Sequence, residues 1–112
     1  MEQALRQIGL TEGEIKIYLA LLELGSSSIT SIIKKSGISG SKTYEVLDRL
    51  MKKGLASSII KNNIKYFEAS HPSRILDYLN EKKEEIEEEK LSIQKVIPNL
   101  ILKQKSAKKA EA

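Results

Sequence analysis

Residues 29–54, with the sequence ITSIIKKSGISGSKTYEVLDRLMKKG, contain two helical patterns separated by a short turn that includes glycine. In the first pattern three isoleucines share one helical face, and Lys-Lys-Ser-Gly ends it at Gly37. In the second, an apolar face extends from Thr43 to Met51, and Lys-Lys-Gly ends it at Gly54. Basic residues in a last turn followed by glycine are typical of a helix end. Two helices joined by such a turn predict a helix-turn-helix.

The segment before this motif predicts a further helix. Thr11 is followed three residues later by Glu14, which is the pattern of a capping box. Apolar residues from Ile15 through Leu22 and Leu24 follow the helical period and widen into a broad stripe. We therefore expect a heavily buried helix here that ends at the next glycine.

After the motif the sequence period changes to that of strands. Residues 55–60 and 64–68 are rich in β-branched and aromatic side chains. They are separated by residues 61–63, Lys-Asn-Asn, a polar turn in which asparagine tolerates positive φ. A β-hairpin placed directly after a helix-turn-helix makes a winged helix. We expect residues 1–72 to form this domain, in a chain that is mainly α with a small β-hairpin.

A long helical pattern resumes at residue 73, and apolar residues recur in it every seven positions. Such a column is typical of a coiled coil, although charged residues occupy much of the neighbouring column. We expect residues 73–102 to form a dimerisation helix, paired parallel or antiparallel and kinked or ended near Pro98, and residues 103–112 to form a basic flexible tail. The expected dimer-interface residues are Leu79, Ile86, Ile93, Val96, Ile97 and Leu100.

The composition argues against several functional classes. The 112 residues include no cysteine, so disulfides, thiolate nucleophiles and cysteine-based zinc sites are excluded. A single histidine argues against histidine-based metal sites and acid–base catalysis. No apolar run approaches the ~20 residues of a membrane span, and the N-terminus has no apolar signal core. We expect a cytoplasmic protein that is not an enzyme and uses no metal, cofactor or membrane.

The net charge of +4 alone says little about a binding partner. The basic residues cluster around the helix-turn-helix and the hairpin, and this cluster indicates an anionic partner. A recognition helix turns its N-terminal outward side chains toward base edges, while flanking groups contact phosphates. Plainer roles compete with this interpretation: a solvated helix face, an ordinary turn, a helix end, or, for Glu45 and Asp48, pairing with nearby basic side chains. The candidate DNA-binding residues are Ser39, Ser41, Lys42, Tyr44, Glu45 and Arg49 on the second helix, Lys61, Asn62, Asn63 and Lys65 at the hairpin tip, and Lys34 and Lys35 before them.

Three segments resemble the TrmB family of archaeal transcription regulators. Residues 8–22, IGLTEGEIKIYLALL, follow the pattern GLT-x-x-E-x-x-x-Y-x-x-L of that family's first long helix. Residues 36–50, SGISGSKTYEVLDRL, with Lys-Gly-Leu at 53–55, resemble its recognition helix and exit. Residues 65–69, KYFEA, followed by His-Pro, resemble its second wing strand. The resemblance covers residues 5–80.

The chain also departs from this family. Ser39 and Gly40 stand where the family often has a proline, which implies a looser start of the recognition helix. Sugar-responsive members carry a large C-terminal effector domain, and the residues after position 72 are too few for one. We therefore expect a short member of the family without a small-molecule effector domain. The sugar sensing of the larger members is not expected of this chain.

The resemblance and the charge pattern together predict a transcription regulator that binds double-stranded DNA sequence-specifically. It would act as a homodimer, with the recognition helix in the major groove and the wing on the flanking backbone or minor groove. A second hypothesis remains open, because winged helices also serve as protein–protein adaptors or assembly modules.

Overall fold

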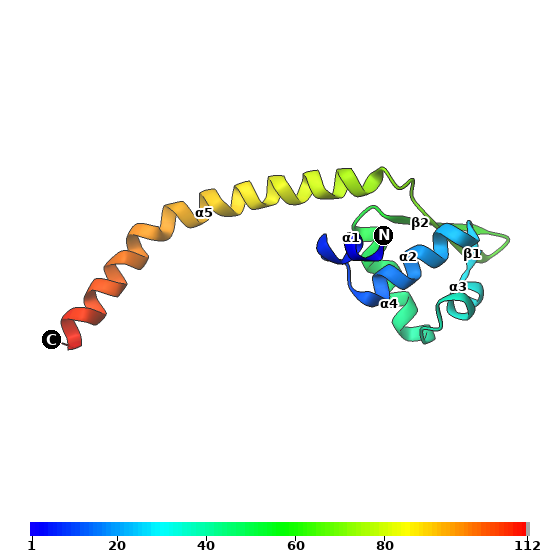
Figure 1. The fold of residues 1–112 in the computed structure, drawn as a ribbon, viewed down its shortest axis with the longest axis horizontal. Helices are drawn as coiled ribbons and strands as arrows, with labels where there is room; N and C mark the ends of the chain where they lie inside the picture. The colour runs from blue at the N-terminus through cyan, green and yellow to red at the C-terminus, as the bar shows by residue number, and fades with distance from the viewer. Residues whose placement is uncertain (112) are drawn as a thin grey trace. The chain divides into compact units, whose positions relative to one another are not determined.

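The computed structural model describes residues 1–111, with side chains for residues 1–107. The chain comprises two compact units, Met1–Leu79 and a second that begins at Asn80. Along the chain the elements are α1 (Glu2–Gln7), α2 (Glu12–Leu24), β1 (Ser27–Ser28), α3 (Ile29–Ser36), α4 (Gly40–Lys52), β2 (Ala56–Lys61), β3 (Ile64–Ala69) and α5 (Arg74–Glu111), as Figure 1 shows.

The start of α2 confirms the predicted capping box. Thr11 Oγ1 accepts a hydrogen bond from the Glu14 backbone N–H at 3.2 Å, and Glu14 Oε1 accepts one from the Thr11 N–H at 3.2 Å. Two of the otherwise unpaired N–H groups around the helix start are thereby satisfied. The predicted helix-turn-helix is confirmed as α3 and α4, and Gly37 ends α3 in the left-handed conformation with φ of 73°.

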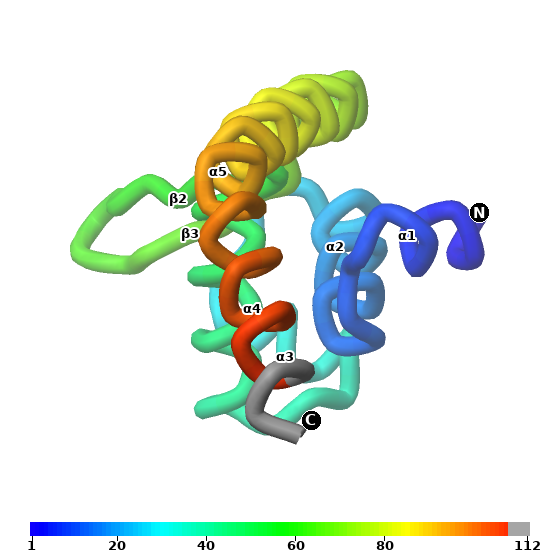
Figure 2. Tube along the Cα trace, turned by 90° about the vertical axis from the view of Figure 1, so that its left-hand side faces the viewer, coloured from blue at the N-terminus to red at the C-terminus, as the bar shows by residue number. Residues whose placement is uncertain are grey.

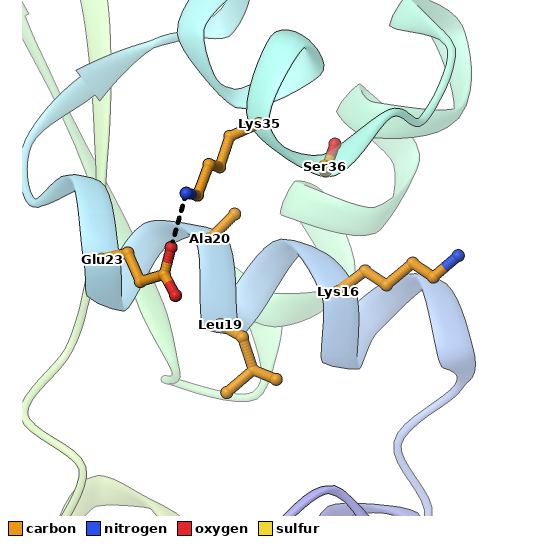
Figure 3. Close-up of a pocket in the computed structure, with 6 residues that line it drawn as sticks. All are labelled: Lys16, Leu19, Ala20, Glu23, Lys35 and Ser36. Carbon is orange, nitrogen blue, oxygen red and sulfur yellow. Dashed lines mark ion pairs between the residues drawn. The ribbon is translucent and has the colours of Figure 1, made fainter.

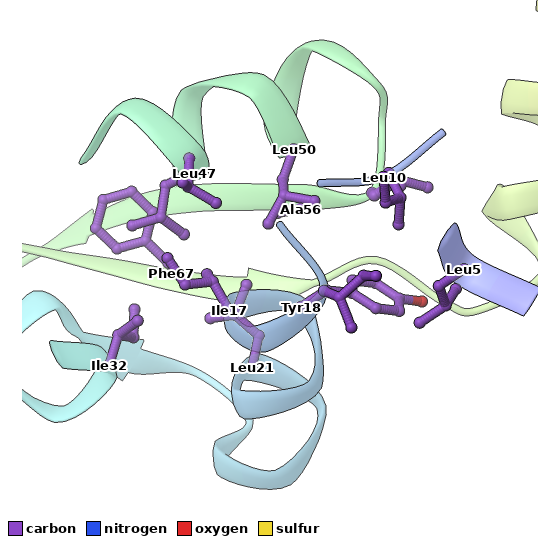
Figure 4. Close-up of a cluster of buried hydrophobic side chains, with 13 residues drawn as sticks. Leu5, Leu10, Ile17, Tyr18, Leu21, Ile32, Leu47, Leu50, Ala56 and Phe67 are labelled. Atoms are coloured by element: carbon purple, nitrogen blue, oxygen red, sulfur yellow. The ribbon is translucent and has the colours of Figure 1, made fainter. Parts of the chain in front are cut away.

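The hydrophobic core lies where α2, α3, α4 and β3 meet, as the side chains in Figure 4 show. Phe67 from β3 packs there with Ile17 and Leu21 from α2 and with Leu47 from α4, and none of the four is more than 1% exposed. Burying a side chain of this size stabilises a fold by roughly 1.5–3 kcal/mol. This packing fixes one face of α4 and so determines which of its side chains face outward.

The sheet contains the predicted hairpin and one further strand. β2 and β3 pair antiparallel from Ala56 opposite Ala69 to Lys61 opposite Ile64. The two central turn residues both have positive φ, 53° and 61°, which matches the type I′ turn expected of asparagine there. Figure 2 shows this hairpin projecting beside the helices. The third strand, β1, pairs with β3 on the other side, so the strand order is β1-β3-β2.

Three local features were not expected. Residues 27–28, whose sequence alone did not indicate a strand, form β1 because β3 offers its free edge for pairing. The expected heavy burial of α2 is confirmed between Glu14 and Leu21, but Leu22 and Leu24 at the end of the helix are 42% and 37% exposed. A short helix, α1, was not expected at all, and it buries Leu5 against the core.

The long helix was expected either to kink or to end near Pro98. The prediction that it ends there is wrong. α5 continues through Pro98 to Glu111, although proline has no N–H to donate to the carbonyl four residues earlier. Its axis bends in the C-terminal half, drawn in orange and red in Figure 1. Near its start, Ile75 and Tyr78 pack against the core. Within residues 1–111 no helix combines the length and the apolar character needed to cross a membrane.

Candidate nucleic-acid interface

The packing of α4 sorts its side chains into two faces. Thr43, Val46, Leu47 and Leu50 are fully buried against the rest of the domain. Because a helix turns by about 100° per residue, the side chains between these positions point outward. The outward face consists of Ser41, Lys42, Tyr44, Glu45, Asp48 and Arg49, all exposed.

The first turn of α4 is held by a threonine inside the helix. Ser39 is the N-cap, and its side chain makes no capping hydrogen bond. Thr43 Oγ1 instead donates to the Ser39 backbone oxygen at 2.8 Å. Gly40 faces α3, and a Cβ there would make ordinary van der Waals contact with Ile33 Cδ1 at 3.6 Å. The exposed hydroxyls of Ser39 and Ser41 therefore belong to a helical turn whose backbone is held on its buried side by the Thr43 hydrogen bond.

The far end of α4 is tied to α2 by a buried carboxylate that sequence analysis identified only as a cap. Glu14 is 1% exposed, and its Oε2 accepts a hydrogen bond from Lys53 Nζ just after α4. Arg49 Nε lies 3.9 Å from the other carboxylate oxygen. These partners come from positions 39 and 35 residues away in the chain, and no short-range pattern signals such a pairing.

The environment of Glu14 shifts its pKa. Burial raises the pKa of this carboxyl, but the hydrogen bonds from Lys53 and from the Thr11 N–H outweigh burial, so the pKa lies below its ordinary value. Glu14 therefore stays ionised in the folded protein and holds two basic side chains at the end of α4.

This shift predicts how stability depends on pH. A carboxyl with a lower pKa in the folded state stabilises the fold above its unfolded pKa of about 4.3, and that contribution is lost as pH falls through the folded pKa. We expect the parent chain to lose stability more steeply than Glu14→Gln as pH falls from about 5 to 3. Urea unfolding at several pH values measures this. Parallel curves for the two proteins would contradict the role of Glu14.

The two acidic residues of α4 differ in their surroundings. Asp48 Oδ2 lies 3.0 Å from Lys52 Nζ, one turn further along the helix, so its pairing with a nearby basic side chain is confirmed. Glu45 is exposed on the outward face. Arg49 is 44% exposed and only loosely paired with Glu14, so its guanidinium can turn toward a phosphate or a guanine edge.

The hairpin tip presents the second candidate group. Lys61, Asn62, Asn63 and Lys65 are all exposed there. Lys65 Nζ lies 5.4 Å from the centre of the Phe67 ring, in the range of a cation–π contact. At the base of the tip, Ser26, Ile59, Lys61, Asn62 and Tyr66 line a surface hollow, so the pairing of β1 with β3 brings the loop before β1 beside the wing.

The two lysines of α3 differ in their surroundings. Lys34 and Lys35 are both exposed, but Lys35 Nζ pairs with Glu23 Oε2 of α2 at 2.8 Å. A phosphate would have to compete with this carboxylate for Lys35. The pair borders an open hollow between α2 and α3, shown in Figure 3, which is lined by Lys16, Leu19, Ala20, Glu23, Lys35 and Ser36.

Among residues 1–107, whose side chains are described, no three metal-ligating groups lie close enough together to hold an ion. The histidine of the chain, His71, accepts a hydrogen bond from the Ser73 backbone N–H at 3.2 Å at the start of α5. Its ring therefore stabilises the turn that leads into α5.

Comparisons with known proteins agree with this geometry. A family model described as "Sugar-specific transcriptional regulator TrmB" matches residues 5–73. The HTH-type sugar sensing transcriptional regulator TrmBL1 of Pyrococcus furiosus is 35% identical over 79 residues, which are 70% of this chain and 23% of that protein. The chain thus spans about a quarter of this relative.

Solved structures share the fold at lower identity. The structure of TrmBL2, named as an archaeal chromatin protein, superposes with a TM-score of 0.80 at 22% identity, covering 99% of this chain and 44% of that one. YusO of Bacillus subtilis superposes with a TM-score of 0.57 at 18% identity, covering 98% of this chain and 81% of that one.

The match over residues 5–73 takes in α2, the helix-turn-helix, the hairpin and the turn that leads into α5. The three segments that resembled the TrmB family thus fall on the elements that build the outward face of α4 and the wing. The chain belongs to the TrmB family of transcriptional regulators, whose DNA-binding domain is a winged helix.

Proposed function

We propose that this chain regulates transcription in the cytoplasm by binding double-stranded DNA sequence-specifically as a homodimer. The first turns of α4 would enter the major groove, and the β2–β3 tip would contact the flanking backbone or minor groove. The observation that carries the proposal is the outward face of α4, where Ser41, Lys42 and Tyr44 are exposed while the opposite face is locked into the core.

The chemistry of the outward face suits groove recognition. A helix about 10–12 Å wide fits the major groove, which is about 12 Å wide. Lys42 can donate to guanine acceptors, and Ser41 can exchange hydrogen bonds with base edges or phosphates. The Tyr44 ring, 54% exposed, is suited to contact a thymine methyl group or a sugar. Glu45 can accept from a cytosine amino group, although this contact is less frequent.

Lys61 and Lys65 at the wing are expected to contribute affinity without sequence preference. The double variant Lys61→Ala/Lys65→Ala should bind any duplex about 10-fold more weakly and lower the salt slope of binding by about 2 per protomer, because phosphate contacts release counterions. Fluorescence anisotropy on two unrelated duplexes measures both quantities. Lys16→Ala/Arg74→Ala removes the same charge from exposed positions outside the wing and is the control for lost charge. Equal affinity of the wing variant and the control would show that the wing does not contact DNA.

The homodimer part of the proposal is supported by the apolar column of α5. Ile86, Ile93 and Leu100 are 57%, 55% and 54% exposed in the single chain, although they recur at coiled-coil spacing. An exposed apolar stripe of this kind marks an association surface. Of the three remaining expected interface residues, Val96 and Ile97 are 42% and 41% exposed on the same helix, and Leu79 is half-buried.

We expect Ile93→Asp to raise the dimer dissociation constant at least about 10-fold, since each dimer then buries two carboxylates in place of two isoleucines. The matched control is Leu91→Asp. Leu91 is equally exposed, at 59%, but lies off the column. Sedimentation equilibrium of the three proteins provides the measurement. The prediction fails if both variants dissociate equally or if the parent chain is a monomer.

The same DNA titrations distinguish the proposed function from two alternatives. Equal affinity for unrelated duplexes would favour a role as a chromatin protein, as named for TrmBL2. The absence of DNA binding would favour an adaptor or assembly module. Selection of bound fragments from random duplex DNA with the purified protein tests the proposal: an enriched sequence supports it, and an unenriched pool overturns its sequence specificity.

A further inference from the structure

The charges of α5 are divided along its length. Residues 74–89 contain three basic and seven acidic side chains, a net charge of −4. Residues 90–107 contain four lysines and no acidic residue, a net charge of +4. Apart from Lys82, which is partly covered, the charged side chains from Glu81 onward in these segments are exposed. The helix is therefore acidic in its first half and basic in its second.

The apolar column has its centre at the same point. Leu79, Ile86, Ile93 and Leu100 are arranged symmetrically about the midpoint between residues 89 and 90, so that Ile86 reflects onto Ile93 and Leu79 onto Leu100. The charge changes sign at this midpoint. A twofold axis there would match apolar residues with apolar residues and the acidic half with the basic half.

We propose that two copies of α5 pair antiparallel, with the twofold axis passing between Glu89 and Lys90. The inference rests on the homodimer proposed above and specifies its geometry. Parallel pairing would place −4 beside −4 in one half and +4 beside +4 in the other. Paired helices lie 8–10 Å apart, about one Debye length at 0.1 M salt, so these charges are only partly screened. They therefore favour antiparallel over parallel pairing of the two helices.

Because the chain has no cysteine, single spin labels can report the arrangement. Glu88→Cys places a label on the helix face opposite the column, and Ser106→Cys places one about 100–120° around the helix from the column. Both positions are exposed. At 1.5 Å per residue, antiparallel pairing separates the two labels at position 106 by about 50 Å along the axis and brings those at position 88 to nearly the same level. Labels at one level on two helices are about 20–25 Å apart.

Double electron–electron resonance on the full chain distinguishes the outcomes. We expect a distance of about 20–25 Å for position 88 and about 50 Å for position 106. A short distance at both positions overturns the antiparallel arrangement and leaves the homodimer intact. No defined distance at either position overturns the homodimer and this inference together, and DNA titrations of the same labelled chains then show whether the DNA-binding part stands.

Salt gives an independent measurement of the same proposal. The antiparallel dimer should dissociate more readily as salt rises from 0.05 to 0.5 M, because opposite charges face each other across it. Sedimentation equilibrium at the two salt concentrations measures this trend. A dimer that becomes tighter with salt would show that like charges face each other and would overturn the proposal.

Discussion

The double variant Lys42→Ala/Arg49→Ala is expected to bind duplex DNA about 100-fold more weakly than the parent chain at ~0.1 M salt. Lys42 lies in the first turn of α4, and Arg49 lies two turns further along the same outward face. In the proposed complex each would donate a charge-assisted contact to a base edge or phosphate, and the proposed dimer would lose both contacts twice. Anisotropy titrations with a selected duplex measure the loss.

The fold should survive this double substitution, because both side chains are exposed and only the 3.9 Å approach of Arg49 to Glu14 is lost. Lys16→Ala/Arg74→Ala removes the same charge from exposed positions outside α4 and serves as the control. We expect that control to weaken binding no more than about 3-fold, through the lower net charge alone. If the two double variants bind alike, α4 is not the recognition helix.

Glu14→Ala is expected to lower the free energy of unfolding by about 3 kcal/mol. The substitution removes the acceptor of Lys53 and one half of the capping box, and it leaves Lys53 without its carboxylate. Removing one partner of a buried pair costs about 3–5 kcal/mol, and the 21% exposure of the Lys53 side chain places this case at the low end, because water can reach the ammonium group. Urea unfolding followed by circular dichroism measures the difference.

Two variants separate the buried pair from general effects of charge. Glu12→Ala removes a carboxylate two residues away whose ion pair with Arg6 is exposed, so we expect a much smaller loss of stability than for Glu14→Ala. Glu14→Gln keeps a single amide oxygen, which can accept only one of the two hydrogen bonds, and should fall between the two alanine variants. The account of Glu14 fails if Glu14→Ala and Glu12→Ala are equally stable.

The parts of the fold that could be predicted were those specified by neighbouring residues. Thr11 and Glu14 are three residues apart and form the capping box that they predict. Asn62 and Asn63 take up the positive φ values that suit them. The outward face of α4 followed in the same way, because the apolar positions of one helix decide which positions remain exposed.

The parts that could not be predicted depend on distant segments. β1 is two residues long and becomes a strand only because the edge of β3 is free. The pairing of Glu14 with Lys53 joins two helices that only the folded core brings together. For α5, Pro98 indicated a kink or an end from local chemistry, whereas the helix continues because losing one hydrogen bond does not outweigh the turns on either side.

The most direct test of the central claim, that α4 and the wing bind duplex DNA through phosphates and groove edges, is the salt dependence of the dissociation constant measured by fluorescence anisotropy. Four candidate basic side chains per protomer, Lys42, Arg49, Lys61 and Lys65, give eight in a dimer. Plotted as log K against log salt, the affinity should fall with a slope of about −7. Binding that is absent at ~0.05 M salt, or that does not change with salt, would contradict the account.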